Sequence, residues 1–183
     1  MGTPQQTTDH QAVVALSRAL DQAGDVLAAV RPDHLDRPTP CEGWTVRQLV
    51  GHLAATPANF LAMNRGEDVD WSAEHEPSDT YVADYRASAD DLIHHWHQRP
   101  DSDAPQADFQ TAELALHTWD LARAIGWSRP LEPLVAERAL AMLEGALTPD
   151  NRGDAFRPPV DVPADAPVYD RLAGFAGRDP STL

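Results

Sequence analysis

Apolar residues recur at steps of three and four residues in two long segments of the chain. In the segment from about Asp9 to Val30, they are Val13, Leu16, Leu20, Ala23, Leu27 and Val30. From about Ser78 to Arg99, the same spacing returns at Val82, Tyr85, Ala89, Leu92 and Trp96. Such stripes are typical of amphipathic α-helices that bury one face against neighbouring helices.

Start and stop signals define two further helices. Thr45 and Gln48 are spaced as a capping box, which predicts a helix from Val46 to about Asn64. Another helix is expected from about Ala107 to Ile125, because Gly126 follows it as a typical C-terminal cap.

The C-terminal part predicts a fifth helix over Pro133–Leu147 and a short last helix over 166–176, between Asp165 and Gly177. The segment 148–164 between them is rich in proline and is expected to be irregular. No segment shows the period-two alternation of apolar and polar residues that marks strands. The sequence therefore predicts an all-α fold, an antiparallel four-helix bundle with a short C-terminal helix.

The chain has 183 residues, of which 42% are hydrophobic and 23% charged, as in ordinary globular proteins. We expect one domain over residues 1–183, with a core of about 9–147 and an added segment at 148–180. No apolar run is long enough to span a membrane, and the first ten residues lack the apolar stretch of a secretory signal.

The formal net charge is −15, and every basic residue is arginine. This charge disfavours nucleic acids and anionic membranes as partners, because both carry negative charge. The absence of lysine excludes Schiff-base chemistry on a lysine side chain. Cys41 is the single cysteine, so no internal disulfide can form, which together with the polar N-terminus indicates a cytoplasmic protein.

Three side chains are candidates for a metal site. Glu113 and His117 are four residues apart on a predicted helix and so share one face, where both can reach one metal ion. His52, beside the apolar face of the helix over 46–64, is the best candidate for a third ligand. Two histidines and one glutamate form a known zinc set with an open position. From spacing alone, a hydrogen-bonded pair on the solvated surface is favoured over a metal site.

Asp120 follows His117 by one helical turn. It either orients His117 as a carboxylate behind the ligand, or it is a surface residue or pairs with Arg123 or Arg47. Cys41 is expected to be a packed thiol rather than a nucleophile. It lies four residues before the helix over 46–64 rather than in its first turn, where the helix N-terminus would lower the pKa of the thiol.

The cluster His94, His95 and His97 is expected to lie on the solvated surface, since adjacent residues of a helix point to different faces.

Two motifs and the C-terminal end resemble a known family. The stretch 38–53, PTPCEGWTVRQLVGHL, resembles the opening of the second helix in the DinB-like superfamily and, more narrowly, in the N-terminal domain of mycothiol-dependent maleylpyruvate isomerases. The pattern of Glu113, His117 and Asp120 resembles the second metal motif of that group. The stretch 166–180 resembles the end of a short subgroup known only as metal-binding proteins.

The resemblance implies a four-helix bundle of DinB type with a metal, usually zinc, on His52, Glu113 and His117. The same donor set also suits nickel, iron or manganese. Characterised relatives are thiol-dependent transferases or isomerases that use mycothiol or bacillithiol. Bundles of this family often pair through a helix face, which is compatible with a homodimer, and the sequence leaves the oligomeric state open.

The function expected from these features is a thiol-dependent S-transferase. A low-molecular-weight thiol such as mycothiol would be held as thiolate on the metal and would attack an electrophile, with no protein residue assigned as catalytic. Two alternatives stay open: a hydrolase in which the metal activates water, and a non-catalytic metal- or ligand-binding module of a stress response.

Overall fold

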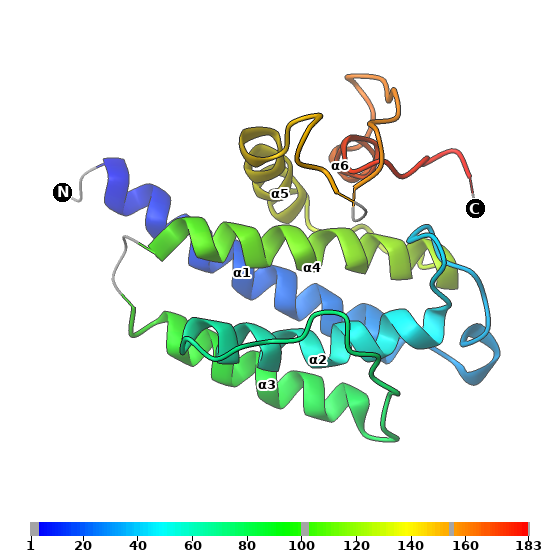
Figure 1. Ribbon diagram of the computed structural model, residues 1–183, viewed down its shortest axis with the longest axis horizontal. Coiled ribbons are helices and arrows are strands. Elements are labelled where there is room, and N and C mark those ends of the chain that lie inside the picture. The colour runs from blue at the N-terminus through cyan, green and yellow to red at the C-terminus, as the bar shows by residue number, and fades with distance from the viewer. Residues whose placement is uncertain (1–3, 100–102, 154–155, 183) are drawn as a thin grey trace.

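The computed structural model describes residues 4–99, 103–153 and 156–182, and the regular secondary structure of these residues is helical (Figure 1). The prediction of an all-α chain is confirmed. The helices are α1 (Pro4–Ala28), α2 (Val46–Asn64), α3 (Tyr81–Trp96), α4 (Ala104–Ile125), α5 (Pro133–Ala146) and α6 (Val168–Phe175), with a short 3-10 helix at Pro32–His34.

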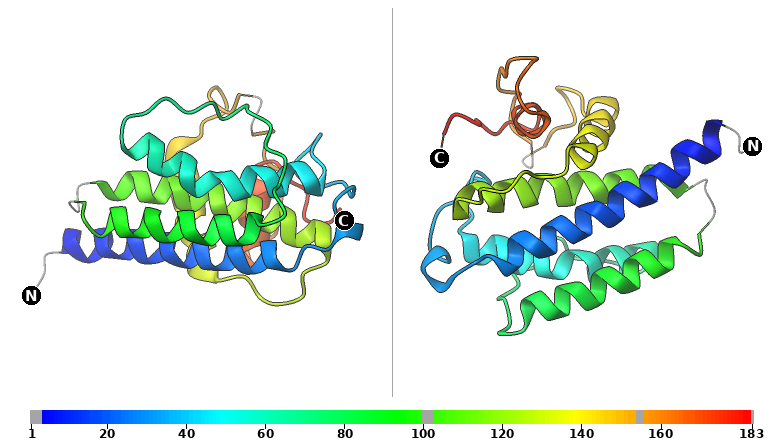
Figure 2. Two further views of the ribbon diagram at one scale, coloured as in Figure 1. Left: turned by 90° about the horizontal axis from the view of Figure 1, so that it is seen from below. Right: turned by 180° about the vertical axis from the view of Figure 1, so that it is seen from behind.

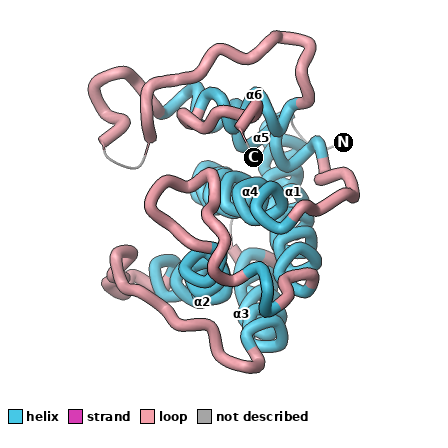
Figure 3. The backbone as a smooth tube through the Cα atoms, turned by 90° about the vertical axis from the view of Figure 1, so that its right-hand side faces the viewer, coloured by secondary structure: helices cyan, strands magenta, loops and turns pink. Residues whose placement is uncertain are grey.

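Helices α1 to α4 lie side by side, and α5 and α6 cover the outer side of α4 (Figures 1 and 3). Helices α1 and α4 run in one direction, and α2 and α3 run in the other. The two pairs are antiparallel to each other, but the helices within each pair are parallel. This arrangement needs the long connection over 65–80, which returns along α2 before α3 begins (Figure 2).

The returning connection packs tightly on α2 at Gly51. A Cβ atom on this glycine would lie 1.6 Å from the carbonyl oxygen of His75. Close by, a guanidinium nitrogen of Arg47 lies 3.9 Å from a carboxylate oxygen of Glu76. The connection is therefore held against the same helix that carries His52.

The predicted apolar stripes form the core. Leu16, Leu20 and Leu27 of α1 are buried, as are Tyr85 and Leu92 of α3. The members at the outer ends of the stripes, Val13, Val30 and Val82, are only partly buried.

Several helix bounds differ from the prediction. Helix α1 begins at Pro4 rather than near Asp9, and α4 begins at Ala104, one turn earlier than predicted. Helix α3 begins at Tyr81 rather than near Ser78. The reason at α3 is local: the hydroxyl groups of Ser78 and Thr80 both donate to Asp84 Oδ2, at 2.8 and 2.9 Å, and occupy the turn before the helix.

The helices that carry the candidate metal ligands are delimited as predicted at two ends. At the start of α2, the Gln48 backbone donates to the Thr45 hydroxyl at 3.4 Å, and the Thr45 backbone donates to Gln48 Oε1 at 3.0 Å. At the end of α4, Gly126 adopts φ 70°, a left-handed conformation that favours glycine.

The C-terminal segment folds back onto α4 and onto the loop before α2. Arg123 of α4 donates to the carbonyl of Pro180 at 2.9 Å, and Arg157 forms an ion pair with Glu42. Buried Arg152 donates to the carbonyl groups of Arg157 and Phe175, at 3.1 and 2.8 Å.

Helix α6 is shorter than the predicted 166–176 and begins after Pro167, so Asp165 lies outside its capping position. None of the described helices combines the length and apolar character needed to cross a membrane.

Candidate metal centre

His52, Glu113 and His117 meet between α2 and α4. The Nε2 atom of His52 lies 2.9 Å from Glu113 Oε1, and the Nε2 atom of His117 lies 3.3 Å from the same oxygen. The donor atoms of all three residues lie within 4.8 Å of one another. The two helices therefore bring together the three side chains that the sequence analysis identified as candidate ligands.

The spacing of these donors matches what one tetrahedral ion requires. With metal–ligand distances near 2.0–2.1 Å, neighbouring ligand atoms of a tetrahedral zinc ion are about 3.3 Å apart. The two imidazole rings of His52 and His117 are inclined at 70° with centroids 4.8 Å apart, so their nitrogens approach from different directions. The three side chains present are therefore a set that fits one divalent ion.

The site is largely shielded from water, and its charges are coupled. The side chains of His52 and His117 are each 12% exposed, and that of Glu113 is 23% exposed. Burial alone raises the pKa of Glu113, but the two imidazoles lower it well below its usual range. Burial alone lowers the pKa of His117, but the Glu113 carboxylate, assisted by Asp120, raises it to about 9. In the metal-free protein, Glu113 and His117 are therefore an ion pair at neutral pH.

Trp44 forms one wall of the site, a role that the sequence analysis did not identify. Its ring is stacked on His117, with 5.7 Å between centroids and 4° between planes, and meets His52 edge-on at 5.0 Å. Trp44 immediately precedes the capping residue Thr45, so the same turn that starts α2 also places the indole against both imidazoles. The motif over 38–53 contained this signal.

Asp120 is fully buried and lies behind His117. Its Oδ2 atom is 3.3 Å from His117 Nδ1, although the angle falls outside hydrogen-bond geometry. Its cationic partner is Arg178, whose nitrogens donate to both carboxylate oxygens at 3.2 and 3.4 Å. The alternatives considered from the sequence, a surface aspartate or a pair with Arg123 or Arg47, are wrong, because Asp120 is buried and pairs with Arg178. Arg178 lies beyond α6, and no local pattern connects it to Asp120.

Cys41 is partly buried on the Asp120 side of the centre. Its thiol, a nitrogen of His117 and a carboxylate oxygen of Asp120 lie within 4.8 Å of one another, forming a second donor group. Burial raises the pKa of Cys41 to about 11, with a further contribution from Asp120. The thiol is therefore protonated at neutral pH, in agreement with the expectation that it is not a nucleophile.

His94, His95 and His97 belong to neither donor group found among the described residues. His94 and His97 are exposed, and His95 interacts with Arg99 at 3.2 Å.

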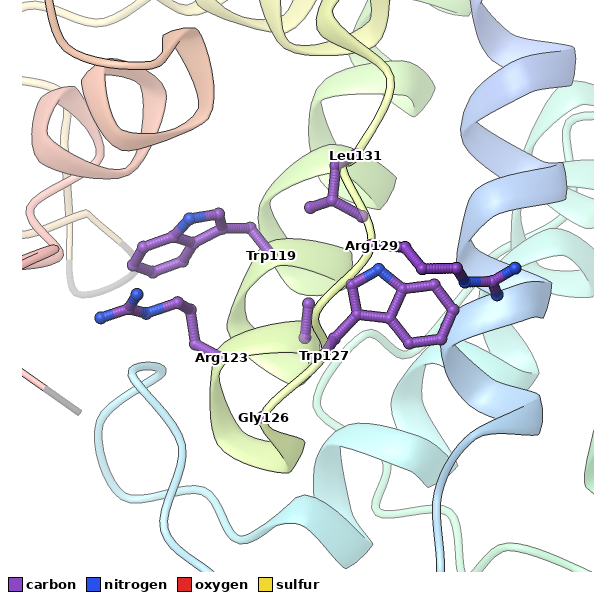
Figure 4. A pocket seen from close by; sticks show the side chains of 7 residues that line it. Trp119, Arg123, Gly126, Trp127, Arg129 and Leu131 are labelled. Carbon is purple, nitrogen blue, oxygen red and sulfur yellow. The ribbon is translucent and has the colours of Figure 1, made fainter.

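A separate cavity of about 360 Å³ lies near the C-terminal end of α4 and is lined in part by Trp119 and Trp127. The guanidinium groups of Arg123 and Arg129 point apart on its two sides (Figure 4), so they do not form a clamp around a shared ligand. Trp119 and Ala122, which also lines the cavity, lie on a different face of α4 from His117.

Residues 16–122 match the family model of the mycothiol maleylpyruvate isomerase N-terminal domain. The chain belongs to this family. It is also 32% identical over 181 residues to the uncharacterized proteins Rv0738 and MT0763 of Mycobacterium tuberculosis, from strains ATCC 25618 / H37Rv and CDC 1551 / Oshkosh. The similarity covers 91% of this chain and 97% of each relative. No solved structure matches the chain.

The match to the mycothiol maleylpyruvate isomerase N-terminal domain extends from within α1 to near the end of α4. It therefore includes His52, Glu113, His117 and Asp120. Arg178, the partner of Asp120, lies outside the matched residues.

Proposed function

We propose that this protein is a metal-dependent thiol S-transferase, with helices α1 to α4 as a four-helix bundle of DinB type. The observation that carries the proposal is the meeting of His52, Glu113 and His117 within 4.8 Å, in a chain of the mycothiol maleylpyruvate isomerase N-terminal domain family. The donor set is two imidazoles and one carboxylate. It suits zinc, our preferred ion, and also nickel, iron or manganese.

His52, Glu113 and His117 would hold the divalent ion, which would stabilise a low-molecular-weight thiol such as mycothiol as thiolate, the nucleophile toward an electrophile. The residues of the chain prepare this site. Glu113 contributes the negative charge that attracts the ion, and Trp44 fixes the planes of both imidazoles. Asp120 lies behind His117, where it favours a proton on Nδ1 and leaves the lone pair of Nε2 available to bind the ion.

A hydrolase is less well supported by the geometry. Metal-dependent hydrolysis uses a general base near the attacking water, and Asp120 is a carboxylate beside the centre that is not itself a proposed ligand. Asp120 is fully buried and receives two hydrogen bonds from Arg178, so it is committed to a structural charge pair. This observation favours a thiol as the nucleophile.

This chemistry also indicates the partners of the protein. The partners are a small-molecule thiol and an electrophile such as an epoxide, an alkyl halide or an activated alkene. We further propose that the protein works in the cytoplasm, as a homodimer, and as one domain over 1–183.

The test combines metal analysis with turnover. Protein purified without chelator or affinity metal should contain close to one equivalent of a divalent metal, and should accelerate reaction of mycothiol with a generic electrophile. Glu113→Gln should lose metal and thiol-dependent rate together, because the amide keeps the shape but removes the negative ligand. Glu144→Gln, an exposed glutamate on α5, is the matched control and should retain both. Stoichiometric metal without turnover of any electrophile would favour the non-catalytic binding module instead.

A further inference from the structure

His117 stands between two donor groups and can serve only one of them at a time. Its Nε2 atom faces Glu113 at 3.3 Å, and its Nδ1 atom faces Asp120 at 3.3 Å. A neutral imidazole carries a proton on one nitrogen and offers a lone pair only on the other. A metal ion bound to Nε2 and a metal ion bound to Nδ1 are therefore alternatives.

By donor chemistry alone, the Nδ1 side is the more attractive one. It offers the Cys41 sulfur and the Asp120 carboxylate in addition to the imidazole. Thiolate is a preferred zinc ligand, and a coordinating thiol loses its proton to the metal even when its ordinary pKa is high. The high pKa of Cys41 does not by itself keep a metal away from this group.

Arg178 distinguishes the two sides. It is 8% exposed, and it lies against Asp120, which is 0% exposed, with contacts of 3.2 and 3.4 Å. A third contact, from Nη1 to the carbonyl of Ala176 at 3.1 Å, ties the guanidinium to the end of α6. Its positive charge also acts on the Cys41 thiol, where it partly offsets the rise that burial gives to the pKa of that thiol.

The two donor groups consequently differ in net charge. With neutral imidazoles, the group of His52, Glu113 and His117 carries one negative charge. In the group of Cys41, His117 and Asp120, the guanidinium of Arg178 cancels the charge of Asp120, so the group is neutral until its thiol ionises. A divalent ion there would have to displace the thiol proton, compete with the two hydrogen bonds that Arg178 donates to Asp120, and lie beside a buried like charge.

We propose that Arg178 is a positioning residue that directs the metal to the Nε2 face of His117. It does so by holding Asp120 behind Nδ1 and by placing its own positive charge beside the Cys41 group. This inference rests on the proposed function, because it presumes a metal on His52, Glu113 and His117. It makes metal selection depend on the C-terminal segment, outside the residues 16–122 that define the family match.

The test uses Co²⁺ as a spectroscopic probe, because a thiolate ligand adds a strong near-ultraviolet charge-transfer band that nitrogen and oxygen ligands lack. Wild-type protein should bind Co²⁺ without this band. Arg178→Met should bind Co²⁺ with the band, and adding Cys41→Ser should remove it. The double variant should also bind Co²⁺ about 10–100-fold more weakly than Cys41→Ser alone, because His117 has lost its oriented partner.

Two further variants separate positioning from simple destabilisation. Arg178→Lys keeps the charge and should bind Co²⁺ without the thiolate band. Arg152→Met removes another buried guanidinium of the same segment. This guanidinium donates hydrogen bonds to the carbonyl groups of Arg157 and Phe175. The Arg152→Met substitution should lower the stability of the protein and leave the Co²⁺ spectrum and affinity unchanged.

If Arg178→Met does not fold because Asp120 is left unpaired, Arg178→Gln removes the positive charge, keeps amide hydrogens that can donate to Asp120, and should show the same band. A thiolate band in the wild type would overturn the inference. So would a folded Arg178→Met protein with the wild-type spectrum, whether its affinity is unchanged or weaker. A wild type that binds no Co²⁺ at all would refute the metal site itself, which is a different result from these.

Discussion

The metal-free protein should lose stability as the pH rises from 6.5 to about 9, because of the ion pair between Glu113 and His117. The pKa of His117 is raised from its usual 6.5 to about 9 in the folded chain. A group whose pKa rises on folding stabilises the folded state below its unfolded pKa, and this stabilisation disappears as the pH passes its folded pKa. The difference corresponds to an upper bound on the order of 3 kcal/mol.

Few other groups disturb this window. Burial lowers the pKa of His34 and of His95 from 6.5, so their contributions lie below the window. The pKa of Cys41 rises from 9.0 to about 11, so it adds to the loss of stability only from the upper end of the window. In Glu113→Gln, burial again lowers the pKa of His117 and only Asp120 opposes it. The slope of stability against pH should therefore become much smaller or change sign.

The assay is urea unfolding of chelator-treated protein at several pH values between 6 and 9.5, followed by far-UV circular dichroism. Glu144→Gln serves as the control and should keep the wild-type slope. Saturating zinc should invert the slope, because protons then compete with the metal for the imidazoles. A metal-free wild type whose stability is flat across this window, or a Glu113→Gln protein with the same slope, would refute the reasoning.

Three further outcomes are expected. Removal of metal should leave the far-UV helical signal intact, because the core is apolar. The free energy of unfolding should fall only by the contribution of metal binding, about 2.7 kcal/mol at a free metal concentration of about 100 times Kd. Loss of helicity on adding EDTA would contradict this. Gly51→Ala should lower the free energy of unfolding in urea by about 1–3 kcal/mol and expose the 65–80 connection to proteases, because its Cβ would overlap the carbonyl of His75. Gly145→Ala, which has open space around it, should be neutral or stabilising. Cys41→Ser should preserve metal content and turnover, and Cys41 in the wild type should react slowly with iodoacetamide at pH 8; abolished turnover in Cys41→Ser would refute the metal–thiolate mechanism.

The sequence predicted what depends on neighbours along the chain. The start of α2 follows from the reciprocal hydrogen bonds of Thr45 and Gln48, which need only a four-residue window. Glu113 and His117 share a face because an α-helix requires it of residues four apart. Even His52, which lies 61 residues from Glu113, could be nominated, because its position beside an apolar face aims it toward a neighbouring helix.

Contacts without a periodic signature could not be predicted. Arg178 lies 58 residues from Asp120 and meets it only because the segment after α6 folds back onto α4. The parallel direction of α2 and α3 likewise follows from the path of the 65–80 connection, which no hydrophobic pattern encodes. The late start of α6, after Pro167, and the late start of α3, after the hydrogen bonds of Ser78 and Thr80 to Asp84, have local causes that the apolar spacing does not contain.

The parallel arrangement of α1 and α4 has a consequence for the order in which the protein assembles during translation. Helix α1 leaves the ribosome first, yet its most extensive helix–helix contact is with α4, which follows two other helices and the long 65–80 connection. His52 therefore emerges without Glu113 and His117, and the pairing that aligns them is a late, long-range event. Arg178 emerges later still, so a nascent chain presents Cys41, His117 and Asp120 without the guanidinium. Metal supplied before release of the chain would meet two competing sites, whereas metal supplied to the finished protein would meet one.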